Sequence, residues 1–378
     1  ALVQGTDVRA VFKSPGLSPD EVAPVWDAAK AMGLWVGTEL SLFVQALSEL
    51  QLSQNYQPQL LAITGTNGKT TVTSLTGQLV ARAGKSAAVA GNIGPTLLDT
   101  LQDHIQGSTL PAVWVLELSS FQLDATEGFE PLVGTVLNIT QDHLDWHGDM
   151  AAYQAAKAKV FGKHGLLLLN RDDPLVMALR EQLAVTSEVP GKGKALRVQQ
   201  RAYVSFGADM PQRPGDFGLE EVNGMTWLVR ALEADETQKK RRAQDDEPEL
   251  HFQRLMPADA LRIRGRHNAL NALAALALAT SAGCGLAAML YGLREYRGEP
   301  HRVESIGVLQ EVEYFDDSKG TNVGATVAAL KGLGADRRVV LILGGEGKGQ
   351  DFAPLAAPVA RYARAVLLIG RDASLIRA

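Results

Sequence analysis

The sequence predicts an α/β fold in which a mainly parallel β-sheet is covered by helices on both faces. Short, wholly apolar segments recur along the middle of the chain, and helical stretches separate several of them. Because both faces of such a sheet are buried, its strands are continuous apolar runs and not alternating ones. With 378 residues, 46% of them hydrophobic and 21% charged, the chain is long enough for two or three globular domains.

Composition and charge exclude several classes of protein. The formal net charge of −5 argues against nucleic acid as the main partner, because proteins that bind DNA or RNA carry a basic surface. The basic run Lys239–Arg242 is followed by acidic residues, which indicates a solvated loop. No apolar run has the length of a membrane span. The single cysteine, Cys284, excludes an internal disulfide and is expected to be a packed or loop thiol, and not a nucleophile, in a protein of the reducing cytoplasm.

The first sixty residues predict a small mixed unit. Val8–Phe12 is a candidate strand, and Ser14-Pro15-Gly16 is a turn signal. Ser18 is a predicted N-cap, with Pro19 at the first helical position and Glu21 placed to complete a capping box. Apolar residues follow at helical spacing to about Met32.

From Leu60 onward the strand–helix alternation begins. A helix is predicted to end at about Ala83, where Gly84 supplies a stop signal. The buried strands are predicted at Leu60–Ile63, Ala87–Ala90, Val113–Leu116, Val133–Ile139 and Leu166–Asn170.

Residues 195–265 lack this alternation and contain scattered strand candidates at Tyr203–Phe206 and Thr226–Val229. The later part of the chain predicts a helix at His267–Ala279, a linker at 298–302, and strands at Arg338–Leu343 and Ala365–Ile369. The chain starts at Ala1 inside a unit and stops at Ala378 just after a strand, where a sheet would normally continue. We therefore expect a shortened version of a longer chain.

The segment Thr64–Thr71, Thr-Gly-Thr-Asn-Gly-Lys-Thr-Thr, follows a strand and precedes a helix. This order is typical of a phosphate-binding loop, whose backbone N–H groups and lysine face an anion while a threonine hydroxyl binds Mg²⁺. The full pattern would have glycine at position 63, where Ile63 stands, so the loop is a short variant. An ordinary glycine turn is the alternative, and the Gly-Lys-Thr at the helix start argues against it.

Taken together with motifs further along the chain, this loop resembles that of the Mur ligase family, the ATP-dependent amide ligases of bacterial cell-wall precursor synthesis. Ser119-Ser120-Phe121-Gln122-Leu123 is most like the member that adds D-glutamate to UDP-N-acetylmuramoyl-L-alanine. The other motifs occur in family order at Gly91–Gly94, Asp142–Asp145, Ala155–Lys157, His267–Asn271, Pro300–Arg302 and Asp317–Asn322.

The resemblance implies three domains with a central P-loop ATPase-like domain and Rossmann-like terminal domains. We expect residues 1–50 to belong to a UDP-binding domain, 51–297 to the ATP-binding domain and 298–378 to an incomplete C-terminal domain. Because the substrates would arrive on different domains, we expect the domains to close during catalysis. We also expect a monomer.

The resemblance also assigns the ATP and metal contacts. Lys69 would bridge the β- and γ-phosphates, and Thr70 and Glu117 would hold a first Mg²⁺. A second Mg²⁺ would be bound by His143 and by Lys157 carrying a carbamate; without the resemblance, Lys157 would be a solvated helix lysine. The remaining predicted ATP contacts are Gly65, Thr66, Asn67, Gly68, Thr71, Asn268, Asn271, Arg302 and Asp317.

Helix capping is the structural alternative for Asn268 and Asn271, because asparagine is a poor residue inside a helix. Lys159 and His147 are not expected to bind metal; His147 is predicted to lie in a loop.

For the substrates, the resemblance places Asn92 and Ser119 near the muramoyl end, Ser14 and Gly16 near the uridine, and Lys319, Thr321 and Lys348 at the D-glutamate carboxylates.

Two alternatives to this function remain open at the level of the sequence. One is another ligase of the family, such as a folate polyglutamate synthase or an enzyme that adds L-alanine or meso-diaminopimelate. The other is a non-catalytic P-loop protein that only binds nucleotide.

Overall fold

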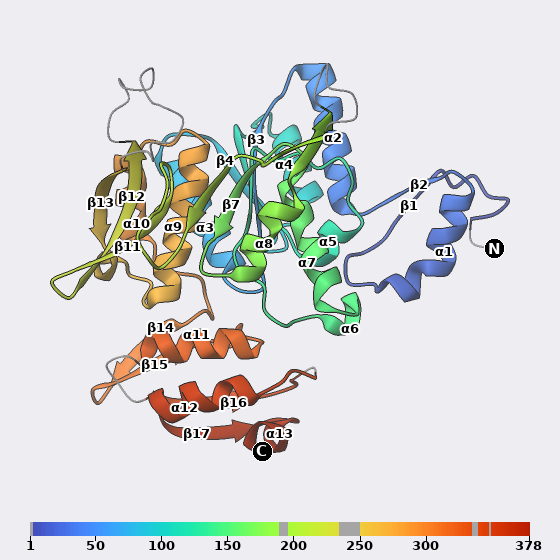
Figure 1. Cartoon of the computed structure of the whole chain (residues 1–378). Coiled ribbons are helices and arrows are strands. Elements are labelled where there is room, and N and C mark those ends of the chain that lie inside the picture. The colour runs from blue at the N-terminus through green and yellow to red at the C-terminus, as the bar shows by residue number, and fades with distance from the viewer. Residues whose placement is uncertain (1–2, 189–195, 234–249, 335–338, 348) are drawn as a thin grey trace.

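The computed structural model describes residues 3–188, 196–233, 250–334, 339–347 and 349–378 (Figure 1). Lys348 and the basic run Lys239–Arg242 lie outside the described residues. No helix among the described residues combines the length and the apolar character needed to cross a membrane.

The centre of the molecule is a nine-stranded sheet with the strand order β13-β12-β11-β10-β7-β6-β3-β5-β4. From β10 to β4 every neighbouring pair is parallel, and β12 and β13 add an antiparallel edge. The predicted mainly parallel sheet is therefore confirmed. Its strands are β3 (Gln59–Thr64), β4 (Ala87–Gly91), β5 (Val113–Glu117), β6 (Val133–Val136), β7 (Leu166–Asn170), β10 (Tyr203–Phe206), β11 (Phe217–Val222), β12 (Met225–Glu233) and β13 (Leu250–Pro257).

The apolar runs of the strands divide between two cores, one on each face of the sheet. In β3, Leu61 and Ile63 belong to the first core, while Leu60 and Ala62 belong to the second. Alternate side chains of a strand point to opposite faces, so a strand buried on both faces must be apolar throughout. The first core includes α3 (Lys69–Arg82), α9 (Arg266–Ser281) and α10 (Leu286–Glu295).

Helices of the second core cover the opposite face of the sheet and come from the earlier part of the chain. Trp114 and Phe43 meet edge to face within it, with ring centroids 5.0 Å apart. The helices are α2 (Glu39–Gln54), α4 (Leu97–Gln106), α5 (Ser120–Asp124), α7 (Met150–Ala158) with η1 (Lys159–Phe161), and α8 (Pro174–Gln182).

One predicted strand is too long, and the difference matters for the site. Val133–Ile139 was expected to be a strand, but β6 ends at Val136. The residues that follow leave the sheet and lie over the loop after β3, where Thr66 N–H donates to Asn138 O (3.0 Å). Apolar character continues past the strand because Leu137 and Ile139 remain buried there.

The N-terminal unit pairs β1 (Ala10–Phe12) with β2 (Trp35–Gly37) in parallel, connected by α1 (Pro19–Ala31). The predicted capping box is present: Glu21 N–H donates to Ser18 Oγ (3.4 Å), and Ser18 N–H donates to Glu21 Oε2 (2.8 Å).

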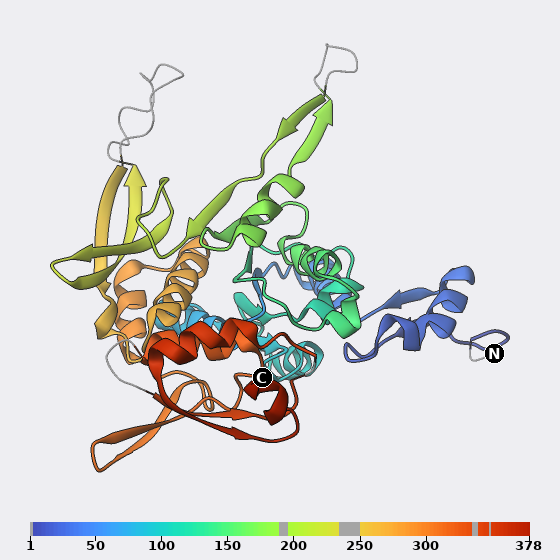
Figure 2. The same ribbon diagram turned by 60° about the horizontal axis from the view of Figure 1, so that its bottom comes forward.

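The C-terminal unit consists of small sheets and short helices, drawn in orange and red in Figures 1 and 2. Helix α11 packs beside α9 of the central part. The elements are the antiparallel pair β14 (Glu304–Leu309) and β15 (Val312–Asp316), α11 (Val323–Leu333), the parallel pair β16 (Val339–Gly344) and β17 (Ala363–Ile369), η4 (Ala353–Leu355), α12 (Ala356–Tyr362) and α13 (Ala373–Arg377). The remaining described elements are α6 (Leu144–His147), η3 (Ala258–Ala260) and the antiparallel pair β8 (Val185–Glu188) and β9 (Leu196–Gln199).

Candidate active site

The predicted phosphate loop lies between β3 and α3, and its last glycine is required by geometry. Gly68 has φ of 85°, in the left-handed region that favours glycine. A Cβ at this position would come within 2.7 Å of Asn271 Oδ1, on the first turns of α9. The loop therefore adopts a backbone that only glycine permits, and helix α3 begins at the next residue, Lys69.

Two lysines point at the same carbonyl of this loop. Lys69 Nζ donates to Gly65 O (2.8 Å) and Thr66 O (2.9 Å). Lys157 Nζ also donates to Gly65 O (2.9 Å), although the two residues are 92 positions apart. Lys157 is only 2% exposed and is not the solvated lysine that its helix alone would suggest.

The environment of both lysines disfavours their charged forms. Burial lowers the pKa of Lys157 well below its usual range, and the neighbouring Lys69 lowers it further, whereas Asp142 opposes both. Burial also lowers the pKa of Lys69; Glu117 and Asp142 counteract this effect. The ammonium of Lys157 lies 4.4 Å from the ring centroid of Tyr153, a cation–π contact.

Glu117 stands at the carboxyl end of β5, where ligands collect in open α/β sheets. It is 1% exposed. Its Oε1 accepts a hydrogen bond from Asn92 Nδ2 (2.9 Å). Among the described residues, no donor reaches its other oxygen, Oε2. A buried carboxylate oxygen without a partner is costly, so it marks a place where a cation or donor would be stabilising.

A cavity of about 250 Å³ joins the ends of β5 and α3 to the C-terminal unit. Arg302 donates from Nη2 to Thr70 Oγ1 (2.7 Å) across this junction. Five of the residues predicted from the sequence line the cavity together, and Ile93, Glu299 and Pro300 complete it. The five are Thr70, Asn92, Glu117, Arg302 and Lys319.

A larger hollow of about 570 Å³ is lined by Glu220 and by Leu250, His251, Phe252 and Arg254 of β13. It contains none of the predicted site residues. Arg254 and Glu220 hydrogen-bond to each other there (2.7 and 2.9 Å), and this pairing accounts for the two charged side chains in the hollow.

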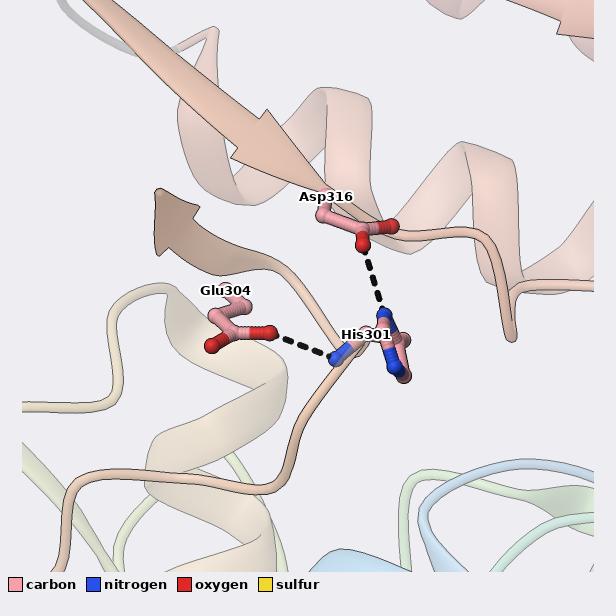
Figure 3. A group of neighbouring side chains, drawn as sticks. All are labelled: His301, Glu304 and Asp316. Atoms are coloured by element: carbon pink, nitrogen blue, oxygen red, sulfur yellow. Dashed lines mark hydrogen bonds and ion pairs between the residues drawn. The ribbon is translucent and has the colours of Figure 1, made fainter. Parts of the chain in front are cut away.

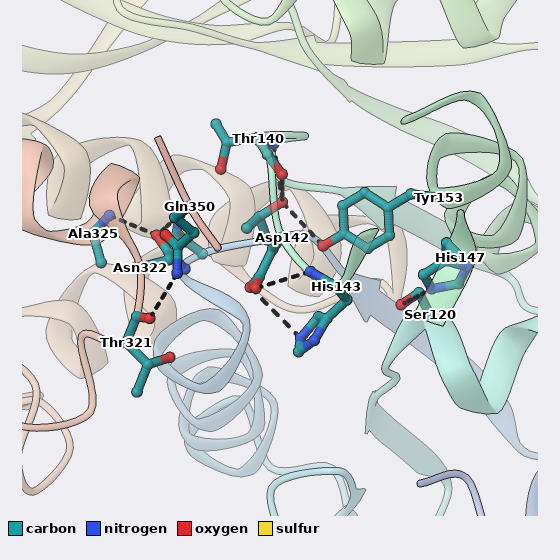
Figure 4. A network of polar contacts seen from close by, with 12 residues as sticks. Ser120, Thr140, Asp142, His143, His147, Tyr153, Thr321, Asn322, Ala325 and Gln350 are labelled. Atoms are coloured by element: carbon teal, nitrogen blue, oxygen red, sulfur yellow. Dashed lines mark hydrogen bonds and ion pairs between the residues drawn. The ribbon is translucent and has the colours of Figure 1, made fainter. Parts of the chain in front are cut away.

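His143 is the N-cap of α6 and has a left-handed backbone, with φ of 54°. Its Nε2 lies 3.6 Å from Asp142 Oδ2 (Figure 4), and its ring meets Phe121 edge to face. His147 lies in α6 and not in the loop predicted for it. There its Nε2 is 2.9 Å from Ser120 Oγ.

Asn268 and Asn271 both lie in the first turns of α9, as predicted. Asn268 Nδ2 donates to Arg264 O (2.8 Å), just before the helix, and Asn271 Nδ2 donates to Asn268 Oδ1 (3.1 Å). The N-cap of α9 is Gly265 and no side chain caps it, so the capping alternative is not supported; Asn271 lies beside the phosphate loop, where a Cβ at Gly68 would meet its Oδ1.

Other predicted residues have local roles in the structure. Ser119 is the N-cap of α5 and forms a capping box with Gln122. Asp317 Oδ1 accepts from Val303 N–H (3.1 Å), and burial raises its pKa. Thr321 O accepts from Gln350 Nε2 at 3.5 Å, a long hydrogen bond.

The turn predicted at Ser14 and Gly16 forms, since Leu17 N–H donates to Ser14 O (3.2 Å). It lies against α6, where Trp146 Nε1 donates to Leu17 O (3.3 Å). Lys13, just before the turn, places its ammonium 4.7 Å from the Trp146 ring centroid.

Sequence reasoning missed Asp142, Glu299, Asn138 and Asn322 as individual site residues. Asp142 and Asn322 stand inside motifs that were recognised, but nothing in the residue type distinguished them. Asn138 follows a strand that ends at the same sheet edge as Glu117, and polarity at that edge is the signal that could have identified it.

Among the described residues, one group of histidine and carboxylate side chains lies close enough together to bind a metal: His301, Glu304 and Asp316 (Figure 3). Its members already satisfy one another. His301 N–H donates to Glu304 Oε2 (2.8 Å), and His301 Nδ1 lies 2.7 Å from Asp316 Oδ2. That contact lowers the pKa of Asp316 to about 2.

Strand, phosphate loop and helix, with a buried acid at the end of the adjacent strand, define a P-loop nucleotide-dependent enzyme on an α/β sheet. The Mur ligase middle-domain family matches residues 63–210, and the family described as Mur ligase, glutamate ligase domain matches residues 301–378. The chain belongs to the Mur ligase family.

The chain is similar to curated proteins named UDP-N-acetylmuramoylalanine–D-glutamate ligase. It is 70% identical over 378 residues to the protein from Albidiferax ferrireducens, covering 100% of this chain and 73% of that protein. It is 55% identical to the protein from Polaromonas sp., over 100% of this chain and 77% of that protein, and 55% identical to that from Burkholderia pseudomallei, over 100% and 73%.

Solved structures share the fold at low sequence identity. MurF from Acinetobacter baumannii superposes with a TM-score of 0.62 at 21% identity, over 91% of this chain and 71% of that one. UDP-N-acetylmuramate-alanine ligase MurC from Thermotoga maritima superposes with a TM-score of 0.56 at 20% identity, over 100% of this chain and 75% of that one.

Proposed function

We propose that this chain is an ATP-dependent ligase that joins D-glutamate to UDP-N-acetylmuramoyl-L-alanine in peptidoglycan precursor synthesis. The relatives that carry this name share 55–70% of its residues over most of their length. The observation that carries the proposal is the cavity that collects Thr70, Asn92, Glu117, Arg302 and Lys319 from segments far apart in the chain.

The reaction needs activation of a carboxylate, because amide formation in water is uphill. In the proposed mechanism the muramoyl-L-alanine carboxylate attacks the γ-phosphorus of ATP, giving an acyl phosphate and ADP. The amine of D-glutamate then attacks the acyl carbon through a tetrahedral intermediate, expelling phosphate and losing a proton. Such phosphoryl transfer depends on positioning and on cations around the transferred group.

The ATP contacts follow from the position of the loop. The N–H groups of residues 65–71 at the start of α3 face the phosphates in this proposal, and Lys69 would exchange its hydrogen bonds to Gly65 O and Thr66 O for phosphate oxygens. Arg302 already reaches Thr70 and is placed to contact a phosphate. Asn271 touches the loop from α9, and Asn268 and Asp317 are proposed to lie nearer the nucleoside.

The site suits a first Mg²⁺ held by Thr70 and Glu117. Both residues line the cavity, and Glu117 Oε2 accepts no hydrogen bond from any described residue. A carboxylate and a hydroxyl are oxygen ligands of the kind Mg²⁺ prefers. When bound, the ion would neutralise charge on the phosphates. Asn92, by binding Glu117 Oε1, fixes the carboxylate orientation.

A second Mg²⁺ is proposed at His143 and a carbamate on Lys157. Only an amine in its neutral form reacts with CO₂, and burial favours that form of Lys157. Carbamoylation would place an anion beside Lys69, and the two side chains would then attract each other. Asp142, which lies next to His143, would orient its ring.

The substrate contacts remain proposals. Asn92 and Ser119 are proposed near the muramoyl-L-alanine end, and Ser14 and Gly16 near the uridine. Lys319, Thr321 and Lys348 are proposed to bind the D-glutamate carboxylates, for which cations and hydroxyls are suited. We also propose the domain division 1–50, 51–297 and 298–378, and a monomer that acts in the cytoplasm.

The test is a ligase assay with UDP-N-acetylmuramoyl-L-alanine, ATP, Mg²⁺ and a panel of amino acids. We expect phosphate release and amide product with D-glutamate, and not with L-alanine or meso-diaminopimelate. Lys69→Ala and His143→Ala should each abolish turnover. A chain that bound ATP but made no amide with any amino acid would be a nucleotide-binding protein only, and the proposal would be wrong.

A further inference from the structure

Three asparagines far apart in the sequence form one hydrogen-bonded chain through the phosphate loop. The side chain of Asn138 forms two hydrogen bonds with the backbone of Asn67. Asn67 N–H donates to Asn138 Oδ1 (2.8 Å), and Asn138 Nδ2 donates to Asn67 O (3.0 Å). The side chain of Asn67 is thereby left to face outward from the loop, toward the C-terminal unit.

There it meets Asn322 in a reciprocal amide pair. Asn67 Nδ2 donates to Asn322 Oδ1 (3.2 Å), and Asn322 Nδ2 donates to Asn67 Oδ1 (2.9 Å), across 255 positions of sequence. Each amide uses a donor and an acceptor in this pair, so both side chains are fixed in orientation. Asn322 is 8% exposed, which strengthens the pair because water competes little for its groups.

Asn322 is also tied to the helix that it begins. As the N-cap of α11, its Oδ1 accepts from Ala325 N–H at 2.9 Å (Figure 4). A movement of the first turn of α11 is thus passed to Asn67. The segment directly before Asn322 contains Lys319 and Thr321, the proposed D-glutamate contacts.

The backbone of α11 approaches the loop closely at Gly324. A Cβ at this glycine would lie 3.3 Å from three atoms: Asn322 Oδ1, Asn67 Nδ2 and Thr140 Oγ1. This is tighter than ordinary van der Waals contact, so a side chain at 324 would force the amide pair or the helix to shift by a few tenths of an ångström.

We propose that Asn322 and Asn67 are positioning residues that couple the ATP loop to the amino-acid side of the active site. ATP phosphates on the loop would hold Asn67 in place, and Asn67 would hold the start of α11 and the Lys319–Thr321 segment that precedes it. The inference rests on the ligase function proposed above, and it concerns how two of its substrates influence each other's binding.

The test is a double-mutant cycle with Asn67→Ala and Asn322→Ser. Serine keeps a good N-cap but is too short to reach Asn67, so helix stability is retained while the pair is lost. We expect each single variant to raise the KM for D-glutamate by about 10-fold at saturating ATP, as loss of one or two buried hydrogen bonds would. The double variant should be no worse than the singles, because both remove the same contact.

Gln350→Ala is the matched control. Gln350 Oε1 accepts from Val323 N–H (2.9 Å) and its Nε2 makes a long hydrogen bond to Thr321 O (3.5 Å), so this change loosens the start of α11 and the segment before it but does not touch Asn67. Its effect on the KM for D-glutamate should therefore add to that of Asn67→Ala, unlike the effect of Asn322→Ser. Gly324→Ala, which crowds the pair without removing it, should resemble the Asn variants.

A second measurement is independent of turnover: titration calorimetry of a non-hydrolysable ATP analogue with and without D-glutamate. In the wild type the amino acid should tighten nucleotide binding, and in Asn322→Ser this effect should vanish with an unchanged melting temperature. Additive KM effects in the double variant, or an unaltered linkage in Asn322→Ser, would overturn the proposal while the wild type still made product. A wild type without ligase activity would instead refute the proposed function.

Discussion

Lys157 is a lysine that the fold buries next to another lysine. Its ammonium and that of Lys69 donate to the same carbonyl, Gly65 O, and Asp142 is the acid that offsets them. Removing an ammonium from water is costly, so the unmodified side chain should weaken the fold at neutral pH. A lysine at this position is therefore explained by its proposed chemical role and not by a contribution to the stability of the fold.

We therefore predict that Lys157→Met raises the melting temperature at pH 7.5 in CO₂-free buffer while abolishing turnover. An unfolded lysine has a pKa of about 10.4. The folded pKa is lowered, so between that lowered pKa and about pH 10 the unfolded chain binds a proton that the native state does not bind, and wild-type stability rises with pH across this window. The gain in melting temperature from methionine should therefore shrink as the pH rises toward 10. Each kcal/mol of stability gained should correspond to roughly 2–4 °C.

The comparison is made by thermal denaturation, with Lys159→Met as the control. Lys159 is exposed at the C-cap of the same helix and donates to Asp124 O, so its replacement should change the melting temperature little and without the pH dependence expected for Lys157→Met. Bicarbonate with Mg²⁺ should stabilise the wild type but not the Lys157→Met variant. A lower melting temperature for Lys157→Met over the whole pH range would show that the buried lysine stabilises the fold.

At the scale of single residues, the sequence could predict those whose chemistry is distinctive. Glu117 ends an apolar strand and Lys69 begins a helix after glycines, so each had a visible reason to be functional. The roles of Asn322 and Asn138 could not be predicted, because their partners lie 255 and 71 positions away and depend on how the units pack.

The carboxyl ends of β4 and β5 are held close together beside the cavity that Asn92 and Glu117 line. Gly91 ends β4 with φ of 111°, and Asn92 N–H donates to Glu117 O (2.8 Å). A Cβ at Gly91 would lie 2.3 Å from that same carbonyl oxygen. The two strands can bring Asn92 and Glu117 into contact only because position 91 has no side chain.

Gly91→Ala should therefore destabilise the protein by about 2–4 kcal/mol, through backbone strain and displacement of β5. Gly84→Ala is the matched control: Gly84 also has a left-handed φ, of 84°, but a Cβ added there would meet no atom within 4 Å. Strain alone should cost the control about 1 kcal/mol. Urea unfolding curves measure both; equal losses would mean that the close approach to Glu117 is unimportant.

Element boundaries followed from the sequence where a residue type enforces them. Ser18 and Glu21 cap α1 as predicted, and α3 ends beside Gly84. The end of β6 did not follow, because Leu137 and Ile139 come after the strand and are nevertheless buried, one in each of the two cores. Hydrophobicity reports burial and does not distinguish a strand from a packed loop.

In the part of the chain that the structure describes, side-chain hydrogen bonds connect the C-terminal unit to the phosphate loop at two places: Arg302 to Thr70, and Asn322 to Asn67. Both involve groups that face the proposed nucleotide site. Binding of ATP would therefore act directly on the residues that link the units, which is the arrangement expected for closure driven by substrate.

We predict that the radius of gyration falls when a non-hydrolysable ATP analogue and UDP-N-acetylmuramoyl-L-alanine are added together. Small-angle X-ray scattering with and without these ligands measures it, and the analogue alone is expected to give a smaller change. An unchanged radius under saturating ligands would contradict domain closure.

For the whole molecule, the strand–helix alternation was enough to predict a mainly parallel sheet, because burial of both faces is visible in the apolar runs. It could not predict the strand order or the antiparallel edge at β12 and β13, since neither leaves a local signature. The meeting of Lys319 and Arg302 with the central cavity likewise depends on packing between units.

The place of β3 in the sheet has a consequence for biosynthesis. Its neighbours are β5 and β6, both of which are translated later, and the loop that follows β3 is gripped by Asn138, 71 positions after Asn67. At ribosomal speeds, about 4–14 s separate the synthesis of these two residues. A nascent chain thus carries the complete glycine-rich loop for seconds with only its local contacts, such as those of Lys69, before Asn138 can bind the backbone of Asn67.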